Sequence, residues 1–346
     1  MLGAMGAGVT LGGLSASATK AAAQSRPASL VVSTFGGDYG NNLKEQVDEA
    51  FTAQYGIDVV HDVGDNAARI AKIKFNLQNG SYDLVNFADA FFSRAEEQKI
   101  LDKMNYDSKN LTNVANVDPS FRYDTWVPTQ FSSYGIAYNP DMVEKPPVSW
   151  LDLWDPKYKG KVLFPNISYS YGIYIFFLGA IAAGKDWKDI NAGAAMLKKF
   201  TTQQPIWGVE DPDVVHALQT KQVALGPFLK ANWVNLHENG SKLQFVSPKE
   251  GGVFVSWGFG IVKDSKNRDW SEKYINIALS PQVQAATAGK RKVIGSNKDW
   301  TKYLDKKEAD LINLSGAEMK NLITFDQKWI NAHRTDLTNT WNSIVS

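Results

Sequence analysis

Short apolar segments alternate with stretches of helical periodicity over the first 90 residues of this chain. Residues 30–34 are predicted to form a buried strand, and Gly56 is expected to end the helix that follows it. Residues 57–60 and 82–87 are further predicted strands, and the helix between them is expected to stop at Gly80. Strands that alternate with helices pack as a parallel sheet covered by helices, so this order predicts an α/β fold.

A second α/β unit follows a proline-rich boundary. The boundary spans residues 139–147 and is interpreted as a crossing between two lobes. Beyond it, residues 162–164 and 223–225 are predicted strands, with helices between and after them. Ser280-Pro281 has the pattern of a helix start, and Gly289 is expected to end that helix. A chain of 346 residues is long enough for two such lobes.

The charge and cysteine content exclude several classes of protein. Thirty-seven Lys and Arg balance 36 Asp and Glu, so no basic field is available to hold nucleic acid or an anionic membrane. The absence of Cys excludes disulfides, thiolate zinc sites and cysteine nucleophiles. The histidines occur singly, without a zinc-binding spacing, at His61, His216, His237 and His333. We therefore expect no metal site and no cofactor.

The first 23 residues have the pattern of a signal peptide. They carry a single charge, Lys20, in an apolar run that ends in three alanines at residues 21–23. The basic segment that normally precedes such a run is absent, which favours a start further upstream; a disordered N-terminal tail is the alternative interpretation. Removal of the segment near Ala23 predicts an exported, periplasmic protein.

Four segments resemble the spermidine/putrescine-binding type of ABC-transporter periplasmic solute-binding proteins, in the same order and at similar separations. They are residues 149–162 (SWLDLWDPKYKGKV), 82–85 (YDLV), 248–254 (PKEGGVF) and 279–283 (LSPQV). The resemblance implies the type II periplasmic binding protein fold, a monomer with two hinged α/β lobes that closes on a small solute and delivers it to a membrane permease. One lobe is expected to hold residues 28–137 and about 259–300, and the other 138–258 and about 301–346.

Open sheets bind ligands beyond the carboxyl ends of their strands, so the loops after the predicted strands are the candidate site. The first such loop is Phe35-Gly36-Gly37-Asp38-Tyr39, where two glycines let a ligand approach free backbone amides. Asp89 follows the third strand. The resemblance implies further ligand contacts at Phe131, Ser133, Asn166, Ser168, Ser170, Tyr171, Lys230, Trp233, Trp257 and Trp341. For each of these residues, a cap, core or surface role is the alternative.

The chain departs from the polyamine binders in its acidic residues. Residues 165–170 and 255–257 hold no carboxylate where that family has acids, and Lys230 adds a positive charge. This favours a small organic acid or amino-acid-like solute, with Lys230 and the amides of Gly36 and Gly37 on its acidic end and Trp257 or Phe35 against its apolar part. A polyamine held by Asp38 and Asp89 is the alternative.

Two weaker alternatives remain. A ferric-ion binder would use the tyrosines at 169, 171 and 174, which are not adjacent as in related iron binders. A periplasmic hydrolase would need a nucleophile motif, and no Gly-x-Ser-x-Gly elbow or Walker loop follows the signal segment. The sequence therefore predicts a binding protein rather than an enzyme.

Overall fold

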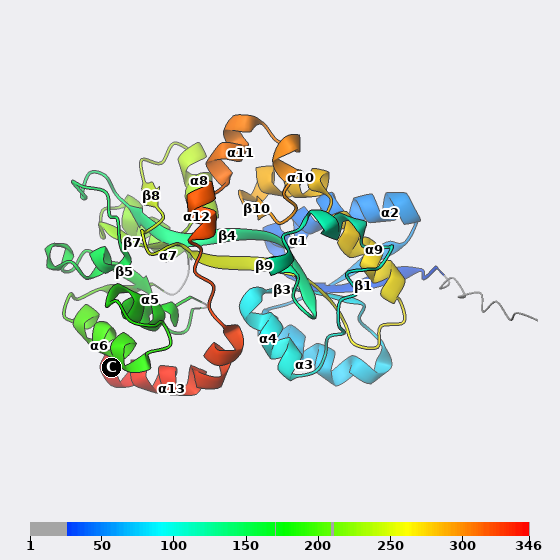
Figure 1. Cartoon of the computed structure of the whole chain (residues 1–346), viewed down its shortest axis with the longest axis horizontal. Helices are drawn as coiled ribbons and strands as arrows, with labels where there is room; N and C mark the ends of the chain where they lie inside the picture. Colours follow the sequence, from blue (N-terminus) through cyan, green and yellow to red (C-terminus); the bar gives the residue numbers. More distant parts are fainter. Residues whose placement is uncertain (1–25, 170, 209–210, 346) are drawn as a thin grey trace, which may run out of the picture.

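The computed structural model describes residues 26–169, 171–208 and 211–345, so the predicted signal peptide at residues 1–23 lies outside the described part. Two long strands, β4 (Trp126–Tyr138) and β9 (Val253–Ile261), run side by side through the middle of the molecule (Figure 1). They belong to an eight-stranded sheet of order β10-β4-β9-β3-β1-β2, in which β7 and β8 also pair with β4. This sheet continues from one lobe into the other.

The first lobe contains the predicted N-terminal α/β unit. Its strands are β1 (Ser29–Thr34), β2 (Asp58–Val63) and β3 (Leu84–Ala88), and both β2 and β3 pair with β1 in parallel. Leu84 faces a core formed with α1 (Gly37–Leu43), α2 (Glu49–Tyr55) and α9 (Arg268–Ala278). Val85 faces α3 (Asn66–Asn76) and α4 (Asp89–Glu97). The alternation of buried residues thus places helices on both faces of the sheet.

The predicted ends of these helices are confirmed. Gly56 and Gly80 both adopt the left-handed conformation, with φ of 63° and 60°, and their amides donate to carbonyls of the preceding turn. Only glycine takes this conformation without strain, which is why each marks the end of a helix. The sheet as a whole is mixed rather than parallel, because β9 runs antiparallel to both β3 and β4.

The second lobe is built on the far half of β4. Its strands are β5 (Leu163–Pro165), β6 (Ile206–Gly208), β7 (Leu225–Leu229) and β8 (Gln244–Val246). Its helices are α5 (Tyr174–Ala182), α6 (Ile190–Thr201), α7 (Asp211–Gln219) and α8 (Lys230–Glu238). A large aromatic core with Trp150, Trp154 and Phe164 holds this lobe together. Burial of such side chains stabilises a fold by several kcal/mol each, at roughly 25 cal/mol per Å².

The C-terminal elements connect the two lobes. They are α10 (Pro281–Arg291), β10 (Ile294–Gly295), α11 (Lys306–Ile312), α12 (Gly316–Lys320) and α13 (Gln327–Val345). In Figure 1, α10 and α11 lie on one side of β4 and β9, and α13 lies on the other side together with α3 and α4. Helix α13 packs against α6 of the second lobe and also against α4 of the first.

One local prediction was wrong, and the place of the crossing between the lobes stays a prediction. Strand β4, which ends just before residues 139–147, pairs with β9 over Trp126–Tyr134 and with β7 and β8 over Tyr134–Tyr138. Helix α10 continues past Gly289 to Arg291 and ends where Lys292 adopts a φ of 57°. Lys292 tolerates this position while its ammonium pairs with Glu238 and Glu308. The lobe boundaries given above remain predictions.

Candidate ligand-binding site

A cavity of about 530 Å³ lies between α4 and the segment that leads into α13. Its walls come from α4, residues 122–126 before and at the start of β4, Phe254 of β9 and residues 324–328. Helix α4 belongs to the first lobe, whereas α13 packs against α6 of the second. We call this the interlobe cavity, because elements from both lobes enclose it.

The interlobe cavity is lined by acids and aromatic rings. The acids are Asp89, Glu96, Asp124 and Asp326, and the rings are Tyr123, Trp126, Phe254 and Phe325. The two cations of its wall are already engaged, since Lys328 pairs with Glu96 at 3.0 Å and Arg122 donates to the carbonyl of Val117 at 2.9 Å. Carboxylates beside aromatic faces suit an ammonium group.

Asp89 lines the cavity at the first position of α4. It follows β3 directly, and its oxygens accept hydrogen bonds from the amides of Ala90 at 2.7 Å and Ser256 at 3.0 Å. Burial raises the pKa of Asp89 to about 7, although these amide donors oppose the shift. Among the described residues no cation forms an ion pair with it. The site can therefore accept a positive charge from a ligand.

Hydrogen bonds connect α5 and α13 to residues of the cavity wall. Burial, and then the negative charge of Asp89, raise the pKa of the Tyr174 hydroxyl. Gln327 donates to the Tyr174 hydroxyl at 3.5 Å, and Asn331 donates to Ser93 of α4. Gln327, Asn331 and Ser93 were not predicted from the sequence, because nothing in their local pattern distinguishes them from other polar residues of amphipathic helices.

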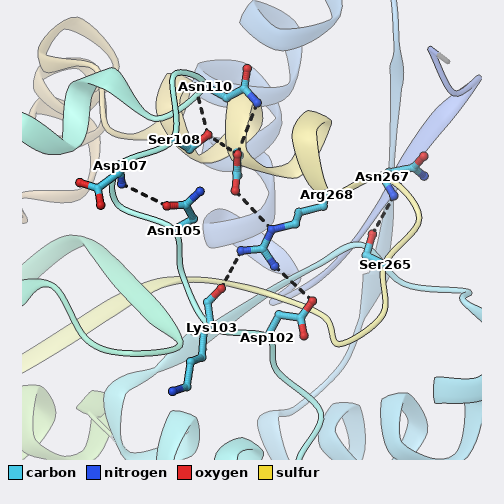
Figure 2. Close-up of polar contacts among 10 residues, drawn as sticks. Asp102, Lys103, Asn105, Asp107, Ser108, Asn110, Ser265, Asn267 and Arg268 are labelled. Carbon is cyan, nitrogen blue, oxygen red and sulfur yellow. Dashed lines mark hydrogen bonds and ion pairs between the residues drawn. The ribbon is translucent and has the colours of Figure 1, made fainter. Parts of the chain in front are cut away.

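The wall at residues 122–126 is fixed from behind by the segment that precedes it. Figure 2 shows Arg268, at the start of α9, pointing toward Asp102 and the carbonyl of Lys103, at 3.2 and 2.6 Å. Glu272, one turn later, pairs with Arg268 and accepts from Ser108. Further along, the Tyr106 hydroxyl lies 2.6 and 2.8 Å from the carbonyls of Tyr123 and Trp126. These contacts hold the aromatic wall in place.

The predicted loop of residues 35–39 lies after β1, but none of it lines the interlobe cavity. The rings of Phe35 and Tyr39 are 4.9 Å apart, and the guanidinium of Arg69 lies 4.6 Å from the Phe35 ring. Tyr39 accepts from Gln130 at 2.8 Å, and Arg291 covers its ring at 4.0 Å. Of the remaining loop residues, Gly36 is the N-cap of α1, Gly37 has a φ of 58°, and Asp38 is exposed. Ligand contact by this loop remains a prediction.

Three predicted ligand contacts lie on β4 and β9, and they differ in their surroundings. Trp257 is half-buried and pairs with Ala88, the residue before Asp89, so it lies close to the cavity. Phe131 is 2% exposed and packs on Phe254 in a core with α8, α10 and α11, which gives it a packing role. Ser133 is fully buried.

The predicted ligand contacts that follow β5 lie in a turn. Asn166 accepts from the amide of Ser168, which is exposed. Tyr171 packs on Tyr134 with ring centres 5.1 Å apart, and Ser170 lies outside the described residues. Because none of the described residues of this turn lines the interlobe cavity, their contact with a ligand stays a prediction.

Lys230, Trp233 and Trp341 lie away from the cavity. The ammonium of Lys230 donates to the carbonyl of Asn313 and faces Glu318, so the connection between α11 and α12 already holds it. Trp233 donates to the carbonyl of Leu243 at 2.9 Å. Trp341 is 3% exposed and packs edge-on against Trp207 in the core of the second lobe. The structure thus gives all three a packing or bonding role inside the protein.

Two α/β lobes joined by long strands, with a polar cavity where both lobes and the last helix meet, define a protein that encloses a small solute. The family model for bacterial extracellular solute-binding proteins matches residues 46–310, and the chain belongs to this family. The predicted family and the type II two-lobe fold are therefore confirmed.

Relatives with named ligands support the same class. The chain is 28% identical over 250 residues to the spermidine/putrescine-binding periplasmic protein of Escherichia coli K12, covering 69% of this chain and 70% of that protein. It is 27% identical over 253 residues to a putative 2-aminoethylphosphonate-binding periplasmic protein of Salmonella typhimurium, covering 71% and 72%. The structure of an ABC transporter protein from Clostridium perfringens superposes with a TM-score of 0.81 at 26% identity, covering 92% of this chain and 100% of that one. The chain is the substrate-binding protein of an ABC transporter.

Two further observations concern the described part of the chain. No helix there is both long and apolar enough to cross a lipid bilayer. No group of three or more His, Cys, Asp or Glu side chains is placed there to hold a metal ion.

Proposed function

We propose that this protein binds a small solute with a primary ammonium group in the periplasm, as a monomer, and delivers it to a membrane permease. The observation that carries the proposal is Asp89, a desolvated carboxylate that pairs with no cation of the described residues and lies in a cavity between the lobes. A desolvated carboxylate is unfavourable until a positive charge pairs with it. A solute ammonium supplies that charge.

The named relatives support this chemistry. Spermidine, putrescine and 2-aminoethylphosphonate, in the names of the two relatives above, all carry a primary ammonium. The four acids of the interlobe cavity provide the counter-charge that residues 165–170 and 255–257 lack. Under this proposal, a polyamine and an amino-acid-like solute both pair an ammonium group with Asp89.

Lobe closure follows from the elements that enclose the cavity. Asp89 and Ser93 line it from the first lobe, and Gln327 lines it from the helix that packs on the second lobe, where Gln327 also donates to the Tyr174 hydroxyl. A solute that contacts both sides binds the closed arrangement better than an open one, and it shifts the equilibrium by that difference. The closed complex is then the form recognised by the permease.

Calorimetry tests the ammonium site. Putrescine, spermidine and 2-aminoethylphosphonate are titrated into the wild type, Asp89→Asn and a matched control, Asp336→Asn, which removes an exposed carboxylate of α13. At least one amine should bind the wild type, and Asp89→Asn should weaken it about tenfold or more, because a charge-assisted contact is lost. The control should bind like the wild type. Lack of binding by every amine, or unchanged affinity in Asp89→Asn, would refute the proposal.

The same samples separate binding from turnover. A binding protein returns the bound amine unchanged, whereas a hydrolase on this scaffold converts it, so mass spectrometry of the solute after incubation distinguishes them. The ferric-ion alternative is disfavoured at Tyr174, because burial and the nearby carboxylate of Asp89 raise the pKa of its hydroxyl and oppose the phenolate form.

A further inference from the structure

A second cavity, of about 640 Å³, lies between α3, α4 and α13. The contact between Ser93 and Asn331 separates it from the interlobe cavity, since Ser93 lines the one and Asn331 the other. Its cations are Lys74, Arg94 and Arg334, and its acid is the exposed Glu97. Positive charge therefore dominates this wall, in contrast to the acidic interlobe cavity.

Arg334 is the unusual member of this group. Its Nε atom is buried and has no hydrogen-bond partner among the described residues. Burial, and then the positive charge of Arg94 across the gap between α13 and α4, lower the pKa of Arg334. Within the described part of the chain, no carboxylate forms an ion pair with Arg94 or Arg334. Two guanidinium groups that line one cavity without an anion repel each other.

We propose that Arg94 and Arg334 form a binding site for a small oxyanion, a carboxylate or a phosphate, that links α4 to α13. Guanidinium groups hold such anions through paired N–H donors, and Arg334 has a buried donor free for this purpose. Lys74, whose ammonium donates to the carbonyl of Gln98, adds positive charge at the rim. The site requires both helices, so it is complete only when α13 lies against α4.

The bound anion has two possible sources with the same chemistry. It is either a free anion or the acidic end of the transported solute. The second source is open because the two cavities adjoin: Asn331, which lines this cavity, donates to Ser93, which lines the interlobe cavity. In that case a solute with an ammonium and an acidic group spans the two sites. The anion site does not involve Asp89, so its test is independent of the test of the ammonium site.

Calorimetry and thermal unfolding with inorganic phosphate and acetate test the site directly. Both are measured on the wild type, Arg334→Gln, Arg94→Gln and a control, Lys198→Gln, which removes an exposed lysine of α6. Saturable stabilisation by at least one oxyanion is expected in the wild type and the control, with affinity at least about tenfold lower in each arginine variant. In buffer without oxyanions, Arg334→Gln should melt above the wild type, because it removes a partly buried positive charge that Arg94 repels. Equal oxyanion affinity in wild type and both arginine variants, or no saturable effect of either anion, overturns the proposal.

A second experiment identifies the source of the anion. Putrescine, which has no acidic group, is compared with 2-aminoethylphosphonate and 4-aminobutyrate in the wild type and Arg334→Gln. If the anion is free, phosphate strengthens putrescine binding in the wild type only. If it is the acidic end of the solute, Arg334→Gln lowers the affinity for 2-aminoethylphosphonate or 4-aminobutyrate about tenfold and leaves the affinity for putrescine unchanged. In that case phosphate also competes with 2-aminoethylphosphonate and 4-aminobutyrate for the wild type. If Arg334→Gln affects none of these quantities, the assignment to Arg334 is wrong.

Discussion

Amine binding at Asp89 should depend on pH near neutrality. Burial raises the pKa of Asp89 from 3.8 to about 7 in the solute-free protein. Primary amines resemble lysine and stay protonated well above this range, so the carboxyl group alone titrates. The ammonium pairs with the ionised form, and a proton on Asp89 therefore competes with the solute. Affinity for putrescine should rise with pH and level off above about pH 7.

The magnitude follows from the size of the shift. At pH 5.5 only about 3% of a carboxyl group with a pKa near 7 is ionised, so the apparent affinity should be about 30-fold below its plateau, or roughly 2 kcal/mol. Stability of the solute-free protein changes in the opposite sense. The folded protein holds this proton more tightly than the unfolded chain, so its stability falls as pH rises from about 4 to about 7, by at most roughly 4 kcal/mol because Asp89 is only partly buried.

Calorimetry from pH 5.5 to 8.0, in buffers of different ionisation enthalpy, measures both the affinity and the proton released on binding. Binding at pH 6 should release close to one proton. Asp89→Asn should remove the release and flatten the pH profile of the affinity and of the unfolding free energy in this window. Wild-type affinity that does not vary between pH 5.5 and 8.0, or an Asn variant with the same profile, refutes the role given to Asp89.

Four substitutions test the remaining assignments. Lys328→Gln should lower solute affinity less than about fivefold by calorimetry, because the lysine is 72% exposed and surface ion pairs contribute under 1 kcal/mol. Trp341→Ala should lower the unfolding free energy by about 3–5 kcal/mol in denaturant titrations, with solute affinity within twofold of wild type. Lys230→Met should lower the melting temperature and leave 2-aminoethylphosphonate affinity unchanged; a tenfold loss of affinity would restore it as a ligand contact. Trp257→Ala should weaken binding with the fold intact, whereas a large drop in melting temperature would indicate a packing role.

The fold was predictable where the local sequence pattern and the packing of the whole chain favour the same structure. The strands β1 and β3 are apolar runs that lead into helices, and Gly56 and Gly80 mark helix ends by their conformation. The prolines of residues 139–147 do not by themselves locate the crossing between the lobes, because prolines mark a break in secondary structure and not the point where a strand changes partners. That point lies inside the continuous strand β4 and is set by its pairing with β7 and β8.

The candidate site was only partly predictable, for a similar reason. The rule that ligands bind beyond strand ends selected Asp89, which lines the interlobe cavity, and its contact with a ligand stays a prediction. The family resemblance selected Lys230, but the direction of its side chain is decided by Asn313 and Glu318, which are distant in sequence. Asn331 and Arg334 were missed because α13 approaches α4 only through tertiary packing, across a separation of 238 residues between Ser93 and Asn331.

The balance of charges in the solute-free molecule explains why closure should depend on a ligand. When α13 lies against α4, Asp89 has no cation and the buried Nε of Arg334 has no acceptor among the described residues. The direct links between these helices, Lys328 to Glu96 and Asn331 to Ser93, are a largely exposed ion pair and a single hydrogen bond. Such links contribute about 1 kcal/mol each, less than the desolvation of an unpaired buried charge. A cation at Asp89 and an anion at Arg334 would remove both penalties only in the closed arrangement, so each ligand group shifts the equilibrium toward it.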